Sequence, residues 1–444
     1  MNPSDTWHIV NTRHDAHSLG QHNSVFTISN GYLGLKGNVC EDRDGYCPVT
    51  LINGVYDELD MFSLIRASNE ERRYLDPRYF DTAGRSPAVA NLPNPLMVRV
   101  FVGDEEISLQ RGEVLAFRQV LFMRGGTYVY ELTYGDRRGR VTRIETCRFA
   151  PLAHPHRVFM HYTVKPIDHD APIRILSGID AAVHSNTTRE RQFRVVATKA
   201  EPPERCILHA RTLARGHDVY VGVLNSARDR SRLKDVRGVV EHNAVYTSYE
   251  FAPAPNDAIT VDRCIVLTCS EDERLGLACD PESELTAAGR QGFQDAAGEN
   301  DAHWKRLWER ADVQIDGDEL AQRYLRFCLF HLLAAAPRHT DRLSVPVKLL
   351  TGEYYQGNTF YDTDTYIAPF YTFTFPEWSR THLNWRWLGL EPGRKIARDF
   401  GYEGAKFAWQ AGPYGEECLG RWWRFVHTNV HINADVAYAL MQYY

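Results

Sequence analysis

The feature that most constrains the fold of this chain is a change of sequence pattern near residue 280. Before it, short runs rich in Val, Ile, Tyr and Thr are separated by Gly, Pro, Asn and Asp, as in TYVYELTYGDRRGRVTRIETCRFA. Within YVYELTY, the side chains of Tyr128, Tyr130, Leu132 and Tyr134 alternate with their neighbours, which is the period of a half-buried strand. Regularly spaced strands of this kind predict a large antiparallel β-sandwich over residues 1–280.

The sequence after this point predicts helices instead. Residues 281–317 combine charged and helix-forming side chains and are expected to form a helical linker. The next segment, DELAQRYLRFCLFHLLAAAP, is apolar on nearly all sides up to Pro337, so we expect other helices to enclose it. Further helices are expected over 392–400, ended by Gly401, and within NADVAYALMQYY. The predicted fold class is therefore α+β, with a helical domain over residues 318–444 after the sandwich and the linker.

Length and charge exclude several classes of protein. At 444 residues the chain is longer than one hydrophobic core usually supports, so more than one domain is expected. The 51 Lys and Arg residues nearly balance the 57 Asp and Glu residues, and no basic block is present, which argues against a nucleic-acid partner. The N-terminus lacks the pattern of a signal peptide, and no apolar run is long enough to span a bilayer. We therefore predict a soluble, cytoplasmic protein without a membrane partner.

Neither the cysteines nor the histidines form a metal-binding pattern. The nine cysteines include no C-x-x-C pair, so buried reduced thiols are expected rather than a disulfide framework or a zinc site. His427 and His431 are four residues apart, as two ligands on one helix would be, but the segment HTNVH lacks the Glu of the H-E-x-x-H motif. No metal site is predicted.

Two aspartates lie in an unusually aromatic stretch, YYQGNTFYDTDTYIAPFYTFTFPE. Burial of an unpaired carboxylate is costly, so Asp362 and Asp364 each need a partner, which can be protein or ligand. From the residues alone, two interpretations of Asp362 remain open. It either binds a ligand, or it caps a helix or holds a turn of the backbone.

Several sequence blocks, taken in order, resemble one known family. They include SVFTISNGYLGLKGN, LINGVYD, NLPNPLMVRVFVGDEEISL, SGIDAAVHSN, the aromatic stretch above and GYEGAKFAWQAGPYGEEC. In this order they resemble glycoside hydrolase family 65, the family of the maltose, kojibiose, trehalose and nigerose phosphorylases and of some related hydrolases. The resemblance implies an N-terminal β-supersandwich, a helical linker and an (α/α)6 toroid, of which only the first part is expected in this sequence.

The resemblance also implies roles for residues of the donor side. Tyr361 and Asp362 match the family's Trp-Asp pair, in which the aromatic ring stacks on the non-reducing glucose and the aspartate accepts hydrogen bonds from its hydroxyls. Tyr361 departs from the family's Trp and Asp364 from its Glu, which leaves the preferred donor sugar open. Trp409 lies in the last matching block and is a further candidate for sugar binding. His431 and Asp435 also match, but we expect them to pack a helix.

The segment after GPYG matches the part of the family's sequences that helps to select the acceptor sugar. In maltose phosphorylases the residues after GEEC read His, any residue, Glu, and help to select the acceptor sugar. Leu419 and Arg421 stand at these positions here, so a different acceptor is expected. Glu416 and Glu417 resemble a catalytic pair, but sequence neighbours rarely flank one bond from opposite sides. A structural role, or hydrogen bonds to acceptor hydroxyls, is predicted for both.

The function implied is that of an inverting α-glucoside phosphorylase or hydrolase that acts on α-linked disaccharides. Inorganic phosphate would be the co-substrate of a phosphorylase, no other cofactor is predicted, and a homodimer is one assembly to test. The family's acid is a Glu in a GPDEYH block, which this sequence lacks. The general acid is therefore expected beyond Tyr444, and the chain by itself is expected to be an inactive N-terminal portion. The alternative is a non-catalytic carbohydrate-binding or assembly protein derived from this family.

Overall fold

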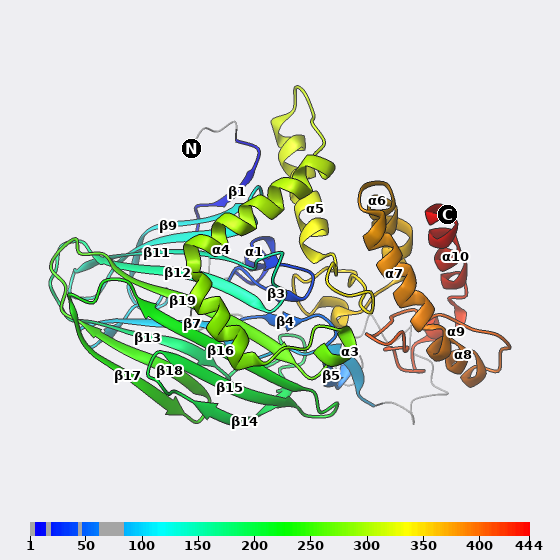
Figure 1. Cartoon of the computed structure of the whole chain (residues 1–444), viewed down its shortest axis with the longest axis horizontal. Helices are drawn as coiled ribbons and strands as arrows, with labels where there is room; N and C mark the ends of the chain where they lie inside the picture. Colours follow the sequence, from blue (N-terminus) through cyan, green and yellow to red (C-terminus); the bar gives the residue numbers. More distant parts are fainter. Residues whose placement is uncertain (1–4, 15–18, 43–46, 62–83) are drawn as a thin grey trace.

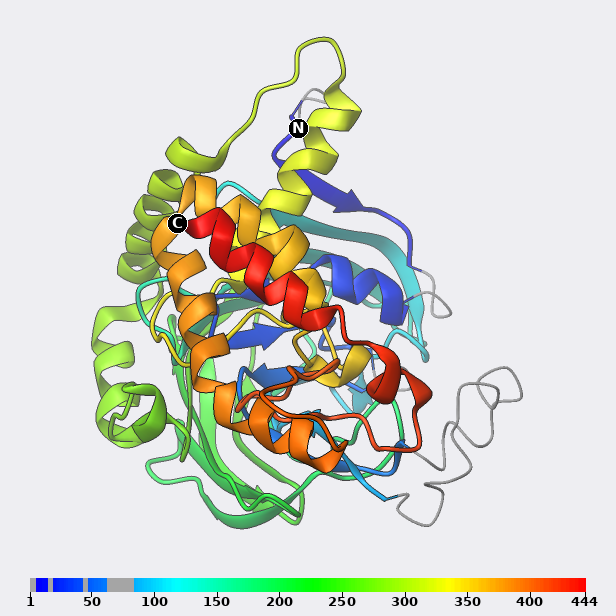
Figure 2. The same cartoon turned by 90° about the vertical axis from the view of Figure 1, so that its right-hand side faces the viewer.

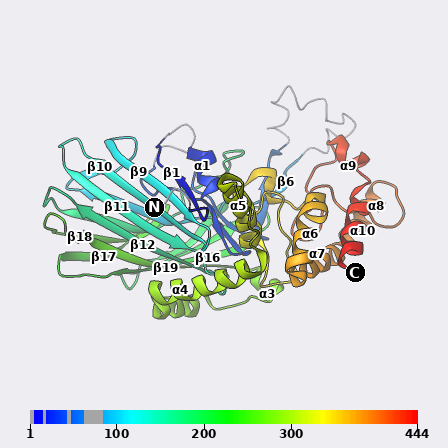
Figure 3. The same ribbon diagram turned by 90° about the horizontal axis from the view of Figure 1, so that it is seen from above.

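The computed structural model describes residues 5–14, 19–42, 47–61 and 84–444. The strands of the described chain lie before residue 270, and most of its helices follow (Figure 1). Seen from above, the sandwich forms one end of the molecule and the C-terminal helices form the other (Figure 3). This arrangement confirms the predicted α+β class.

The sandwich is built from two large antiparallel sheets. The larger has nine strands in the order β1 (His8–Asn11), β9 (Glu113–Phe122), β10 (Thr127–Gly135), β11 (Val141–Phe149), β12 (Arg157–Pro166), β19 (Ile259–Cys269), β16 (Asp218–Ala227), β15 (Arg205–Thr212) and β14 (Phe193–Lys199). The second has five, in the order β17 (Leu233–Glu241), β18 (Ala244–Phe251), β13 (Ile173–Asp180), β7 (Asn94–Val102) and β8 (Glu105–Glu106).

Two small sheets lie beside the sandwich, where it meets the helices. One contains β2 (Ile28–Ser29), β3 (Leu33–Leu35) and β4 (Thr50–Ile52), and the other pairs β5 (Tyr56–Leu59) with β6 (Ser86–Val89). In β10 the alternation read from the sequence is present, because its residues at 128, 130, 132 and 134 are all buried. These side chains belong to the main hydrophobic core.

The two long helices after the sandwich each begin at an aspartate whose side chain caps the first turn. Before the sandwich strands lies α1 (Leu19–Val25), and after them lie α3 (Asp272–Leu275) and α4 (Pro281–Ala311). The side chain of Asp280 accepts a hydrogen bond from the Ser283 N–H at 2.8 Å and so caps α4. Asp318 caps α5 (Glu319–Ala335) in the same way, through the Ala321 N–H at 2.9 Å. A buried face of α4 packs on β12, β16 and β19 of the larger sheet (Figure 1).

The remaining helices form the C-terminal part of the chain. They are η3 (Tyr354–Gly357), the π-helix η4 (Thr363–Ile367), α6 (Ala368–Thr374), α7 (Pro376–Leu388), α8 (Leu390–Asp399), α9 (Arg424–Thr428) and α10 (Ile432–Tyr443). Helices α6, α7 and α10 contact one another and lie side by side (Figure 2). Within the described ranges, each helix is too short or too polar to cross a membrane.

The expectation that other helices enclose α5 is wrong. Arg326 on α5 lies over the ring of Trp7, with its guanidinium carbon 3.8 Å from the ring centroid, so one face of the helix packs on the sandwich side. On another face, Phe330 stacks on Trp304 of α4 at 4.9 Å. Tyr324, also on α5, is 59% exposed. The apolar residues of α5 are therefore shared between sandwich and helices, and one continuous core joins the two parts.

Candidate active site

Three aromatic rings from distant segments meet at the start of the helical part. The ring of Tyr361 lies 5.4 Å from that of Trp409 and 4.9 Å from that of His431, and the last two are 5.9 Å apart. The imidazole of His431 is itself held by Asp435, whose carboxylate lies 2.7 Å from Nδ1. These rings, called the aromatic wall below, include both aromatic residues that the sequence predicted for sugar binding.

Asp362 follows Tyr361 of this wall in the chain, and its carboxylate has no partner among the residues that the structure describes. Asp362 precedes η4 but makes no side-chain capping bond, so the interpretation as a helix cap is wrong. The residue is half-buried, and no described residue forms a hydrogen bond or ion pair with its side chain. A carboxylate that is partly removed from water and has no protein donor is available to a polar ligand.

Asp364 has the opposite environment. It is fully buried, its Oδ1 lies 2.8 Å from Nε2 of His382, and it accepts two hydrogen bonds from the Arg386 guanidinium, that from Nε at 3.1 Å. Burial alone would raise the pKa of Asp364, but the adjacent Arg386 and His382 lower it to about 2. This aspartate therefore holds α7 against η4 and does not face a ligand.

Both glutamates of the GPYGEE turn are bound to other parts of the protein. Glu416 accepts a hydrogen bond from Nη1 of Arg215 at 3.0 Å. Glu417 accepts from the backbone N–H groups of Trp409, Gln410 and Leu419 at 2.7, 3.1 and 3.2 Å. Burial raises the pKa of Glu417, although these N–H groups counteract the shift. The two carboxylates shape the turn, which is the first of the roles predicted for them.

Leu419 and Arg421 line a cleft of about 450 Å³. Helix α8, strand β6 and the segment 416–422 form its walls, with an apolar floor that includes Ile396 and Phe400. Arg421 is held at the rim by an ion pair with Asp399 at 3.4 Å. Tyr361, Asp362 and Trp409 do not line this cleft, so the predicted residues fall into two groups.

Backbone hydrogen bonds connect the two groups. Thr359 and Ala411 form an isolated antiparallel bridge, with N···O distances of 2.9 and 2.8 Å in its two directions. Beside the bridge, the amide of Asn358 donates to Gln410 at 3.1 Å. The bridge fixes the start of the Tyr361 segment against the turn that leads to Leu419.

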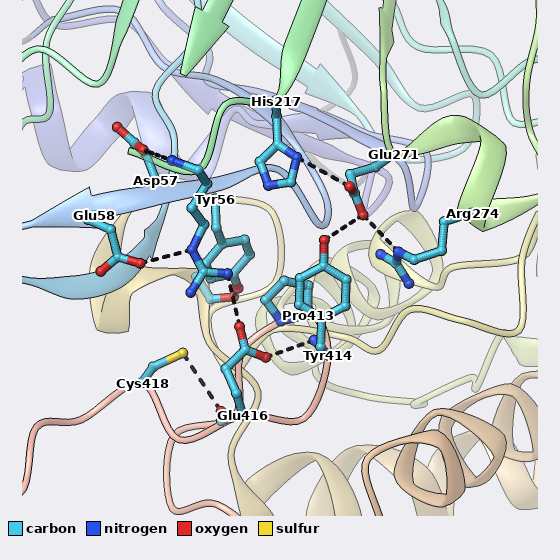
Figure 4. A network of polar contacts seen from close by, with 12 residues as sticks. Tyr56, Asp57, Glu58, His217, Glu271, Arg274, Pro413, Tyr414, Glu416 and Cys418 are labelled. Atoms are coloured by element: carbon cyan, nitrogen blue, oxygen red, sulfur yellow. Dashed lines mark hydrogen bonds and ion pairs between the residues drawn. The ribbon is translucent and has the colours of Figure 1, made fainter. Parts of the chain in front are cut away.

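Residues of the sandwich that support the site were not predicted. Tyr56, Arg215 and Glu271 contact the helical part through their side chains. Figure 4 shows the contact of Glu271 with Tyr414. Arg215 and Glu416 are 201 positions apart in the chain, and no local pattern signals such a pair. For His431 a signal did exist, since the block HINADVAY matches the family.

Comparisons with known proteins agree with this architecture. The family model described as "Glycosyl hydrolase family 65, N-terminal domain" matches residues 9–307, and "Glycosyl hydrolase family 65 central catalytic domain" matches residues 326–444. The fold and the site therefore define a class of protein in which a β-sandwich is joined to a helical catalytic domain. The chain belongs to glycosyl hydrolase family 65.

The relatives found include three phosphorylases. A kojibiose phosphorylase of Thermoanaerobacter brockii is 25% identical over 99% of this chain and 56% of its own length. An alpha,alpha-trehalose phosphorylase of the same organism is 26% identical over 99% of this chain and 57% of its own length. A 3-O-alpha-D-glucosyl-L-rhamnose phosphorylase of Lachnoclostridium phytofermentans is 27% identical over 99% of this chain and 58% of its own length. The chain therefore spans little more than half the length of these relatives.

A solved structure supports the fold alone. It is of a protein from the human microbiome, is 21% identical, and superposes with a TM-score of 0.86 over 99% of this chain and 56% of that chain.

Proposed function

We propose that this chain supplies the donor wall, which consists of the aromatic wall and Asp362, and the acceptor segment 416–421 of an inverting phosphorylase or hydrolase of α-linked disaccharides. The observation that carries the proposal is Asp362, a half-buried carboxylate without a partner among the described residues, adjacent in the chain to Tyr361 of the aromatic wall. Kinship with phosphorylases of three different disaccharides supports the same reaction class.

This constellation suits a pyranose sugar for physical reasons. The faces of a pyranose ring are apolar and pack on aromatic planes, while its hydroxyls point outward and donate hydrogen bonds. A carboxylate acceptor gives charge-assisted hydrogen bonds, which are roughly twice as strong as neutral ones. Tyr361 and Trp409 would bind the ring of the non-reducing glucose, and Asp362 would accept from its hydroxyls.

In the reaction proposed, the glycosidic carbon–oxygen bond breaks as an acid protonates the leaving oxygen. Phosphate, or water in a hydrolase, attacks the anomeric carbon from the opposite face, so that its configuration is inverted. Glu416 and Glu417 are not assigned as the acid, because Arg215 and three backbone N–H groups already bind their carboxylates. Leu419 and Arg421 would face the acceptor sugar, which we expect to differ from that of maltose phosphorylases.

We further infer that the protein is cytoplasmic and forms a homodimer, with inorganic phosphate as its co-substrate if it is a phosphorylase. No metal, organic cofactor, membrane or nucleic acid takes part in the proposed reaction. The near balance of 51 basic and 57 acidic residues supports the last point. The domain limits proposed are residues 1–280 for the sandwich, 281–317 for the linker and 318–444 for the first part of a toroid.

The first prediction concerns sugar binding by the chain itself. Titration calorimetry with glucose, kojibiose and trehalose is expected to show binding that Asp362→Asn weakens by about 2 kcal/mol, or roughly thirtyfold, because a charge-assisted hydrogen bond is lost. Asp295→Asn is the matched control, since Asp295 is exposed on α4. Failure of the wild-type chain to bind any of these sugars would contradict the proposal.

Turnover is measured on the same samples, with and without phosphate. Because neither glutamate of the GPYGEE turn is assigned as the acid, we expect sugar binding without cleavage by these 444 residues. Phosphate-dependent glucose 1-phosphate that disappears in Glu416→Gln or Glu417→Gln would place the acid in this turn instead.

A further inference from the structure

One strand and one turn of the sandwich together contact both segments of the candidate site. Figure 4 shows Tyr56, Asp57 and Glu58 of the strand near Glu416 and Tyr414. On β5, the hydroxyl of Tyr56 donates to the carbonyl of Gly357, which ends the turn before the Tyr361 segment. The next residue, Asp57, is fully buried and accepts from the backbone N–H groups of residues 213, 214 and 215, at 3.3, 2.8 and 3.0 Å. Three amide donors on one carboxylate fix the turn between β15 and β16 against β5.

The fixed turn directs Arg215 into the helical part. Its Nε donates to Glu58 of β5 at 2.9 Å, and its Nη1 donates to Glu416 at 3.0 Å. Burial alone would lower the pKa of Arg215, but the carboxylates of Glu416 and Glu58 raise it above its ordinary value. One guanidinium therefore joins the sandwich to the GPYGEE turn, and its planar fork suits two carboxylates at once.

A second contact holds the same turn. The hydroxyl of Tyr414 donates to Glu271 at 2.8 Å, and Glu271 also accepts from Nε of Arg274 at 2.7 Å and lies 3.2 Å from Nδ1 of His217. Burial would raise the pKa of Glu271, but these partners lower it to about 2, so the carboxylate is charged over the whole neutral range. The guanidinium of Arg274 lies 4.6 Å from the ring centroid of Tyr414.

Within the turn, the position of Glu416 determines where the acceptor segment begins. Its second carboxylate oxygen accepts from the Tyr414 N–H at 2.9 Å, and its carbonyl accepts from the Gly412 N–H at 2.9 Å. Gly415 takes a φ of 81°, which closes the turn without strain only for glycine. Glu416 is therefore held on both sides, and the chain leaves it directly toward Leu419 and Arg421.

We propose that Arg215 is a positioning residue which, through Glu416, sets the acceptor segment 416–421 relative to the donor wall. The inference rests on the proposed function, since it assigns the acceptor side to this segment. Loss of Arg215 leaves intact the backbone bridge between Thr359 and Ala411, which involves no side chain. The donor wall then stays in place, while the segment beyond Gly412 loses the ion pair that ties Glu416 to the sandwich. It keeps the contact between Tyr414 and Glu271 and the three N–H bonds to Glu417. The effect is selective for acceptor binding.

The test compares the affinity for glucose with that for a disaccharide in the 444-residue chain. In Arg215→Met we expect an unchanged dissociation constant for glucose and a preference for the disaccharide over glucose that falls about tenfold. Arg215→Lys is expected to be intermediate, because a lysine ammonium reaches one carboxylate but lacks the fork. The matched control is Arg237→Met, which removes an exposed arginine from β17 of the second sheet.

A double-mutant cycle tests whether Arg215 acts through Glu416. If it does, Arg215→Met combined with Glu416→Gln lowers the disaccharide preference no further than either change alone. A merely structural role for Arg215 would weaken glucose and disaccharide binding alike, and would overturn the proposal. An equal preference for the disaccharide over glucose in wild type and Arg215→Met would also overturn the proposal.

Hydrogen exchange separates this proposal from the proposed function. Arg215→Met is expected to speed amide exchange in residues 409–421, where Glu417 holds three amides, and to leave exchange in β9 to β12 unchanged. If the wild-type chain binds no sugar, the proposed function fails, and the exchange measurement alone decides whether Arg215 positions the segment. Unchanged exchange in 409–421 then overturns the inference.

Discussion

At the scale of single residues, two aspartates separated by one threonine have unrelated roles. Asp364 is closed off by His382 and Arg386, while Asp362 has no partner among the described residues. The sequence showed that both needed partners, but it could not assign them. Those of Asp364 lie 18 and 22 positions away on α7, and only the fold brings them together.

The second prediction follows from this difference. Asp364→Asn is expected to lower the free energy of unfolding by roughly 3–5 kcal/mol, because it leaves the buried guanidinium of Arg386 without its counter-charge. Asp362→Asn is the internal control and should change stability by no more than about 0.5 kcal/mol. Urea unfolding followed by circular dichroism measures both. Equal effects of the two variants would show that Asp364 is not paired in solution.

The third prediction concerns the pH dependence of the same pair. In the folded protein the pKa of Asp364 is about 2, below the ordinary value of 3.8. The depressed pKa means that the carboxylate contributes stability above pH 3.8 and loses that contribution as the pH falls toward 2. The free energy of unfolding of the wild type should therefore fall more steeply than that of Asp364→Asn between pH 4 and pH 2. Parallel curves would contradict the assignment.

At the scale of elements, the sequence predicted what depends on local pattern and missed what depends on tertiary contacts. The helix at 392–400 is present as α8, from Leu390 to Asp399, because proline near its start and Gly401 after its end are local signals. The π-helix η4 was not predicted, since no local signal marks it. The partners of α5 were mistaken, because an apolar helix surface does not reveal whether strands or helices will cover it.

The fourth prediction tests the proposed domain limits. The buried face of α4 packs on the sandwich through Leu285, Ala288 and Ala296, so the linker helix should remain attached to it. Limited proteolysis is expected to cut first between α4 and α5, where Val313 is 51% exposed, and to release a resistant N-terminal fragment. Mass spectrometry identifies the fragment ends. Early cuts within β9 to β19 would count against a stable sandwich.

At the scale of the whole molecule, three large apolar side chains of the helical part are exposed to solvent. Phe373 on α6, Trp387 on α7 and Met441 on α10 are 80%, 70% and 68% exposed. Exposed apolar side chains of this size are candidates for a site of association. The local sequence does not explain this exposure, because each of the three side chains lies on a helix that also has buried residues.

The fifth prediction is that this chain associates in a concentration-dependent manner through these exposed side chains. Sedimentation velocity should show the average mass rising with concentration, because association removes the exposed apolar side chains from water. The double change Phe373→Ser and Trp387→Ser should weaken this association, while Val240→Ser, at an exposed valine of β17, should leave it unaltered. A single species at all concentrations would contradict the expectation and the homodimer.

The backbone bridge between Thr359 and Ala411 has a consequence for how this family can diversify. Because the bridge uses only main-chain atoms, its two hydrogen bonds do not depend on the side chains at these positions, which are both buried and therefore limited in size. Mutations at 419 to 421 can then accumulate while Tyr361, Asp362 and Trp409, which we propose bind the donor sugar, keep their places. Enzymes with one donor sugar and many acceptors would arise by exchange of a few adjacent codons, and segments swapped between relatives at Ala411 should transfer acceptor preference as a unit.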